Sequence, residues 1–154
     1  REVLAAADML EADWGIAGDV WSITSFTELR RDGLDTERWN LLNPTEKPRQ
    51  SRVSKMFEKS SGPIVASTDY MKLYADQIRP FMPKGRDFRV LGTDGFGRSD
   101  FRARLREHFE VDRRFVVLSA LRALADEGSI PATKVAQALS QYGIDPAKAN
   151  PHYA

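Results

Sequence analysis

Two short apolar stretches, each followed by a polar turn, decide the fold: 63-PIVAS-67 and 87-DFRVL-91. The first follows Gly62 and leads into Thr68-Asp69, which has the composition of a helix start. The second leads into the glycine-rich turn 92-GTDGFGRSD-100. A continuous apolar run between a turn and a helix start is typical of a buried parallel strand. We therefore predict parallel strands over 63–67 and 87–91, each followed by a helix.

The segment before these strands predicts one more strand and two short helices. Residues 20-VWSITSF-26 are rich in β-branched and aromatic side chains, which favour a strand. Ser25 and Glu28 have the spacing of a capping box. The short helices are predicted over 27–31 and 35–42, with Asp32-Gly33 as the break between them. Further helices are predicted over 1–14, 70–79, 101–109, 112–127 and 129–142 from their apolar spacing and end signals.

This order of elements predicts a single α/β domain over residues 1–154. Strands that alternate with helices indicate a three-layer, open, mostly parallel sheet with helices on both faces. Because a helix precedes the first readable strand, we expect that a first strand of the sheet lies upstream of Arg1 and is missing from this chain. Residues 44–52 (PTEKPRQSR) combine two prolines with mixed charge, which predicts an exposed loop.

Composition excludes several classes of protein. The chain has 154 residues, and its 23 Lys and Arg are balanced by 22 Asp and Glu, which argues against a strongly basic nucleic-acid binder. No apolar run approaches the about 20 residues that a membrane-spanning helix needs. There is no cysteine, and hence no disulfide framework, which suits a reducing compartment such as the cytoplasm.

The turn at 92–100 is the best candidate for a functional site, because open α/β sheets bind ligands at the carboxyl ends of their strands. A glycine-rich turn between a strand and a helix can hold phosphate on its backbone N–H groups. However, Gly92, Gly95 and Gly97 match neither the P-loop nor the dinucleotide spacing, and the turn contains no lysine. We favour the interpretation that these glycines permit tight turns and positive φ angles.

The remaining candidates for catalysis are few. His108 is predicted inside a helix next to Phe109, where a packed or partly exposed histidine is favoured over a general base. Asp69 and Asp94 follow neighbouring strands and could pair across the sheet edge, although Asp69 is explained equally well as a helix cap. These residues alone do not specify an active site, and they favour a supporting module.

Four stretches carry a resemblance that covers nearly the whole chain. They are 19-DVWSITSFTEL-29, 37-ERWNLLNP-44, 66-ASTDYMKLY-74 and 90-VLGTDGFGRSDFRARLREHFEV-111. The last is similar to the signature of transketolase C-terminal domains. Together the four resemble the C-terminal domain of the homodimeric bacterial pyruvate dehydrogenase component, a thiamine diphosphate-dependent decarboxylating subunit.

The resemblance implies a parent enzyme that oxidatively decarboxylates pyruvate and passes the acetyl group to a lipoyl group. Thiamine diphosphate and magnesium are then expected in the other domains of the parent, with none bound by this chain. The implied partners are those domains, the second subunit of a homodimer and the dihydrolipoyl acetyltransferase component, without nucleic acid or membrane. The residues that we predict to form contacts are Asp94, Phe96 and Arg98, with Asp69 and His108.

Two alternatives stay open from the sequence. One is an independent α/β module that binds a nucleotide or a phosphate ligand at the turn beginning with Gly92. The other is a docking module for the acetyltransferase component, in which the basic residues of 44–52 attract an acidic partner.

Overall fold

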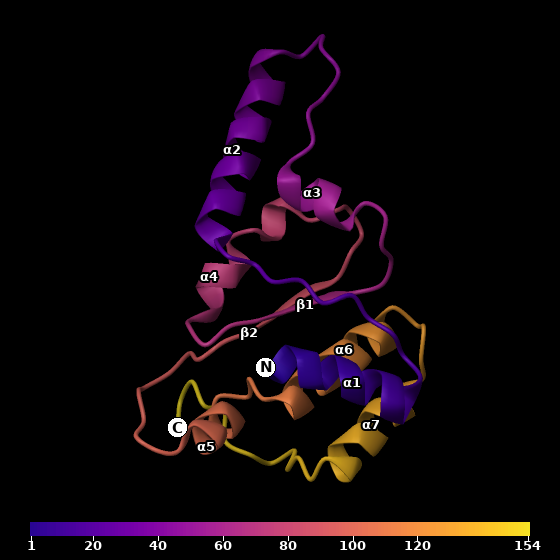
Figure 1. Ribbon diagram of the computed structural model, residues 1–154, viewed down its shortest axis with the longest axis vertical. Coiled ribbons are helices and arrows are strands. Elements are labelled where there is room, and N and C mark those ends of the chain that lie inside the picture. Colours follow the sequence, from indigo (N-terminus) through magenta and orange to yellow (C-terminus); the bar gives the residue numbers. More distant parts are fainter.

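The structure, a computed structural model, describes all residues 1–154 and places helices on both sides of a small parallel sheet (Figure 1). The predicted α/β class and its three-layer arrangement are confirmed. The elements in chain order are α1 (Glu2–Trp14), α2 (Phe26–Leu42), α3 (Arg52–Phe57), β1 (Ile64–Ser67), α4 (Lys72–Asp76), the 3-10 helix η1 (Arg79–Phe81), β2 (Phe88–Leu91), α5 (Arg102–His108), α6 (Arg113–Asp126) and α7 (Ala132–Gln141).

The sheet consists of the two strands that the sequence indicated most clearly. β1 and β2 pair in parallel, with Ile64 opposite Phe88 and Ser67 opposite Leu91. Because successive side chains of a strand point to opposite faces, each strand contributes to two separate cores. The short β1 and β2 therefore join two hydrophobic clusters that lie on opposite sides of the sheet.

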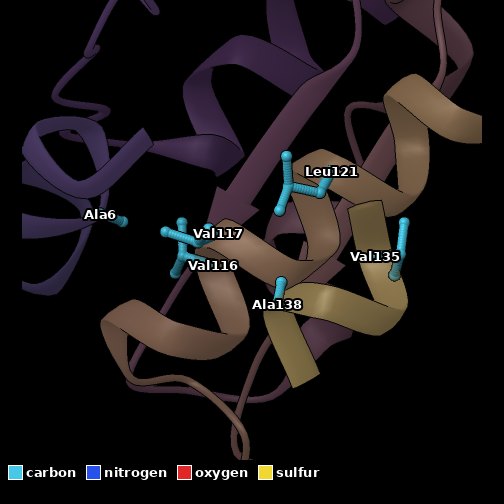
Figure 2. Packing of buried hydrophobic residues seen from close by; sticks show 6 residues of the cluster. All are labelled: Ala6, Val116, Val117, Leu121, Val135 and Ala138. Atoms are coloured by element: carbon cyan, nitrogen blue, oxygen red, sulfur yellow. The ribbon is translucent and has the colours of Figure 1, made fainter. Parts of the chain in front are cut away.

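One core lies between the sheet and helices α1, α6 and α7 (Figure 1). Val65 of β1 and Leu91 of β2 pack against it from the sheet. At its edge Trp14 donates a hydrogen bond of 2.7 Å from Nε1 to the hydroxyl of Tyr142. Figure 2 shows its six buried residues, which are Ala6, Val116, Val117, Leu121, Val135 and Ala138.

The second core lies on the opposite face, beneath α3 and η1. Ile64 and Ala66 of β1 pack against it together with Val90 of β2. Its five buried residues are Val53, Phe57, Ile78, Phe81 and Phe88. The alternation of side chains along β1 and β2 thus gives the sheet a hydrophobic layer on each face.

The strand predicted over 20–26 and the break at Asp32-Gly33 are both wrong. Residues 15–24 form no helix or strand, and a single helix, α2, runs from Phe26 to Leu42. Gly33 lies inside α2 and packs against Phe81. A Cβ at this position would come within 2.5 Å of the Phe81 ring, so only a residue without a side chain fits there. The capping prediction is confirmed, since the Ser25 hydroxyl accepts a hydrogen bond from the Glu28 N–H at 3.2 Å.

Other boundaries also differ from the predictions. The helix predicted over 70–79 is divided into the short α4 and η1, and Pro80 lies within η1. Helix α3 was not predicted; its N-cap is Ser51, which is buried and whose hydroxyl accepts a hydrogen bond from the Ser54 N–H. Residues 44–50 of the predicted loop are exposed.

An apolar cavity of about 810 Å³ lies beside the first strand. It is lined by α1, by the extended segment 16–23 and by β1. Strand β1 pairs only with β2, so its other edge has no strand partner. Residues of β1 line this cavity. None of the helices is long and apolar enough to cross a membrane.

Candidate functional site

The segments that follow β1 and β2 are joined to each other at the carboxyl edge of the sheet. The Thr93 N–H donates to the Tyr70 carbonyl oxygen at 2.9 Å, and the Thr93 hydroxyl donates to the Asp69 carbonyl oxygen at 3.2 Å. The Asp94 carboxylate accepts a hydrogen bond of 3.0 Å from the Lys72 N–H, at the first residue of α4. Asp94 therefore caps a helix that begins 22 residues earlier in the chain.

Asp69 and Asp94 do not pair with each other, and Asp69 caps no helix. The side chain of Asp69 is 79% exposed and lies 3.6 Å from a guanidinium nitrogen of Arg106. Helix α4 starts after Met71 without a side-chain cap from its own segment. The capping role predicted for Asp69 is thus filled by Asp94 from the neighbouring turn.

Two of the three glycines in the turn are explained by close packing. A Cβ at Gly92 would lie 2.6 Å from the Tyr70 carbonyl oxygen and 2.7 Å from the Lys72 nitrogen. Gly95 has a φ of 118°, and a Cβ there would overlap the carbonyl oxygen of Pro151. Only Gly97 has open space around its missing side chain. Of these three glycines, Gly95 alone has the predicted positive φ, while Gly92 is required by its close contacts with the backbone of Tyr70 and Lys72.

The tip of the turn presents aromatic side chains to solvent. Phe96 is 82% exposed, and Phe101, immediately before α5, is 83% exposed. Arg98 between them is exposed and forms no ion pair. Aromatic side chains and arginine are enriched in the surfaces through which proteins contact one another. The base of the turn is therefore fixed by backbone packing, while its tip is free to meet another surface.

His108 is the last residue of α5. Its Nε2 is buried and has no hydrogen-bond partner among the protein atoms, and its ring packs edge-on against Phe109 at 4.8 Å. Burial lowers the pKa of the His108 imidazole, and the positive charges of Arg98 and Lys148 lower it further. The half-buried imidazole of His108 packs against Phe109, as the sequence favoured over a general base.

The C-terminal segment contacts both the end of α5 and the glycine-rich turn. The sequence did not predict these contacts. The Lys148 ammonium donates to the His108 carbonyl oxygen at 2.8 Å and to the Glu110 carboxylate at 3.0 Å. Three residues later Pro151 contacts Gly95. No spacing rule relates Lys148 to His108, because the two residues are 40 positions apart and meet only through the fold.

A second missed feature is an arginine cluster around Glu2. The Glu2 carboxylate lies 3.2 Å from Arg106 and 3.0 Å from Arg113. The hydrogen bond from Arg113 lowers the pKa of Glu2. The Asp112 carboxylate holds Arg114 and raises the pKa of its guanidinium. The two Glu2 pairs connect the start of α1 with α5 and α6.

The glycine-rich turn does not fit a diphosphate, and the side chains of this chain do not fit a metal ion. No three His, Asp or Glu side chains are grouped so that they could hold a cation. The backbone around Gly92 and Gly95 is filled by Tyr70 and Pro151, and Asp94 adds a negative charge at the turn. We therefore derive no chemical step through thiamine diphosphate or magnesium from this chain.

Comparison with known proteins places the chain in a family. The transketolase-like TK C-terminal domain family matches residues 1–112. The chain is 59% identical over 151 residues to the pyruvate dehydrogenase E1 component of Cupriavidus necator and 60% identical over 151 residues to that of Pseudomonas aeruginosa, each match covering 98% of the chain and 17% of the relative. It is 53% identical to the Escherichia coli K12 protein of the same name, over 100% of the chain and 17% of the relative.

The chain thus spans about a sixth of the length of the curated relatives it matches, all of which are named as one enzyme component. Its helices on both faces of a parallel sheet agree with the family match. The chain belongs to the transketolase-like C-terminal domain family.

Proposed function

We propose that this chain is the C-terminal supporting domain of a pyruvate dehydrogenase E1 component. The parent enzyme would decarboxylate pyruvate oxidatively in the cytoplasm and transfer the acetyl group to a lipoyl group. Thiamine diphosphate and magnesium would be held by its other domains. The high identity to proteins with this name over almost the entire chain supports the proposal.

Within the parent, the proposed role of the chain is contact with the other domains and with the second subunit of a homodimer. The observation that carries this role is the turn 94–98, whose base is fixed by Asp94 while Phe96 is 82% exposed. An exposed phenylalanine on a rigid base can be buried at little cost in conformational entropy. Arg98 beside it can pair with a carboxylate of the facing surface.

The test is a Phe96→Ala/Arg98→Ala double variant of the intact protein, compared by analytical ultracentrifugation and thermal unfolding. Burying a phenylalanine is worth about 1.5–3 kcal/mol, so we expect the dimer dissociation constant to rise by about tenfold or more. The matched control is Arg38→Ala/Leu41→Ala on α2, which removes an exposed arginine and a leucine that is 78% exposed. Unchanged dimerisation and heat resistance in the first variant would count against the proposed contact.

The acetyltransferase component is the third proposed partner, through the loop 44–50. The observation that favours this second role is the exposure of Lys47 and Arg49 on that loop. A pull-down with the acetyltransferase component, using the intact protein and a Lys47→Ala/Arg49→Ala variant, tests it. Equal capture of the unmodified protein and the variant would contradict a docking role for the loop.

A further inference from the structure

A pocket of about 660 Å³ lies beside α5 and includes Phe101, which follows the glycine-rich turn. Two helices and the first residues of α1 form it, and only two of its ten lining residues are hydrophobic. Five arginines line it: Arg102, Arg104, Arg106, Arg113 and Arg114. Arginine presents several N–H donors in a planar fork that matches the two oxygens of a carboxylate.

Three carboxylates inside the same pocket hold most of these arginines in place. Glu2 pairs with Arg106 and Arg113, and its side chain is only 16% exposed. Asp112, which is 11% exposed, pairs with Arg114 at 2.6 Å. The more open Glu107 lies 3.1 Å from Arg114 and 3.3 Å from Arg104. With five arginines against three carboxylates, the pocket stays positive, whereas the whole chain has a net charge of only +1.

The inner carboxylates therefore orient the arginines without neutralising them. Arg104 remains 71% exposed and Arg113 49% exposed despite their ion pairs. Arg102 is exposed and forms no ion pair in the structure. Phe101, at 83% exposure, stands at the same rim and adds an apolar surface next to the free guanidinium groups. Outside the pocket lie two further negative charges, Asp69 beside Arg106 and Asp100, whose carboxylate accepts a hydrogen bond from the Phe101 N–H.

We propose that this pocket, lined by arginines of α5 and α6, binds an acidic segment of a partner protein. Carboxylates of that segment would pair with Arg102 and Arg104, and one apolar side chain of the segment would cover Phe101. A protein segment fits better than nucleic acid, because the basic charge is confined to one pocket and does not extend over a face of the molecule. The proposal does not depend on the dimer contact through Phe96.

The experiment is a fluorescence anisotropy titration of the intact protein. The probe is a labelled glutamate-rich peptide with one central leucine, and a peptide of the same length in which glutamine replaces glutamate is the neutral comparison. We expect saturable binding of the acidic peptide that weakens as NaCl is raised from about 50 mM to about 300 mM, because salt screens exposed charges. The glutamine peptide should not bind.

Two double variants locate the binding. Arg102→Ala/Arg104→Ala removes two exposed guanidinium groups, and at about 0.2–1 kcal/mol for each exposed pair the affinity should fall by about twofold to thirtyfold. Arg30→Ala/Arg31→Ala removes two exposed arginines of α2 and should leave the affinity unchanged. The circular dichroism spectra of both variants should match the spectrum of the protein without substitutions.

Four results would overturn the proposal, and the first three concern the peptides and the variants. These three are absence of saturable binding, equal binding of the glutamine peptide, and equal loss of affinity in both double variants. Competition by inorganic phosphate at a concentration equivalent to that of the peptide's carboxylates would instead indicate a small-anion site, which also contradicts a protein segment as the ligand.

Discussion

The turn after β2 and the loop between α2 and α3 are both exposed at their tips, but they are held in different ways. In the turn, backbone atoms of Tyr70 and Pro151 pack directly against glycines. In the loop, Asn40 of α2 exchanges two side-chain hydrogen bonds with the backbone of Arg49, at 3.0 and 2.8 Å. Backbone packing leaves no room for another side chain, whereas side-chain hydrogen bonds to an exposed loop can be replaced by water.

The two segments also differ in what they present to solvent. The turn presents the apolar Phe96 on a fixed base, and the loop presents charged and proline residues. The Arg49 guanidinium lies 3.9 Å from the centre of the Trp39 ring, so part of the loop's charge is already engaged with α2. The comparison therefore favours the turn as a contact surface, and the following predictions test the difference.

The largest effect is expected for Gly92→Ala. The new methyl group would lie within 2.7 Å of two backbone atoms, and such overpacking costs about 1–3 kcal/mol. Hydrogen exchange of the intact protein should show a matching loss of protection in the segments around Tyr70 and Thr93. Gly97→Ala, where the added methyl group meets no atom within 4 Å, is the control. Equal protection in the two variants would show that the turn is not held by backbone packing.

Lys148→Met should have the next largest effect. It removes a charged donor from the His108 carbonyl oxygen and from Glu110, while a methionine side chain keeps most of the aliphatic volume. Because a hydrogen bond to a charged group is worth about 1.5–3 kcal/mol and Lys148 is partly exposed, we expect a local loss of about 1–2 kcal/mol. The measurement is hydrogen exchange of α5 and of the glycine-rich turn.

The control for Lys148→Met is Lys47→Met in the loop, where the lysine is exposed and forms no ion pair. Its effect on exchange should be negligible. If both substitutions changed the protection of α5 equally, the C-terminal segment would not be what holds the turn.

A smaller effect is expected for Asn40→Ala in the loop. Its two exposed hydrogen bonds with Arg49 should contribute about 0.5–1.5 kcal/mol together, since water can replace them. Exchange should rise only between residues 44 and 50, and the turn should be unaffected. A loss as large as that of Gly92→Ala would remove the contrast between the two segments.

The smallest effect concerns pH. Because burial lowers the pKa of His108 below its usual value near 6.5, the folded chain binds this proton less tightly than the unfolded chain. Acidification through pH 6.5 toward the lowered pKa should therefore destabilise α5. Arg98 and Lys148 act in the same direction, whereas Glu110 opposes them.

His108→Gln should remove this dependence, so that protection of α5 declines less between about pH 7.5 and about pH 5.5. His152→Gln changes an exposed histidine near the C-terminus and is the control. An unchanged pH dependence in His108→Gln would show that another group is responsible.

The candidate site could be predicted only in part. The position of the turn, the positive φ of Gly95 and the packing of His108 against Phe109 follow from local signals, because glycine spacing and the boundary between strand and helix depend on adjacent residues. The capping of α4 by Asp94 and the anchoring by Lys148 could not be predicted. Each joins residues that are far apart in sequence and that meet only after the sheet and the C-terminal segment are in place.

Segment 20–26 shows why local preference was insufficient in the fold. Its β-branched and aromatic residues favour a strand, but a strand needs a hydrogen-bonded neighbour, and β1 pairs only with β2. Gly33 shows the converse, because a residue that usually ends a helix is retained inside α2 where the Phe81 ring leaves no room for a side chain.

The sequence by itself determined the parallel strands, the caps and apolar faces of the longer helices and the family of the chain, since each depends on residues close together or on a continuous match. Only the tertiary structure decided which glycines are packed against backbone, which carboxylate caps α4 and where the arginines gather. The physical reason is that propensity and capping act over a few residues, whereas steric exclusion and charge pairing depend on atoms that folding alone brings together.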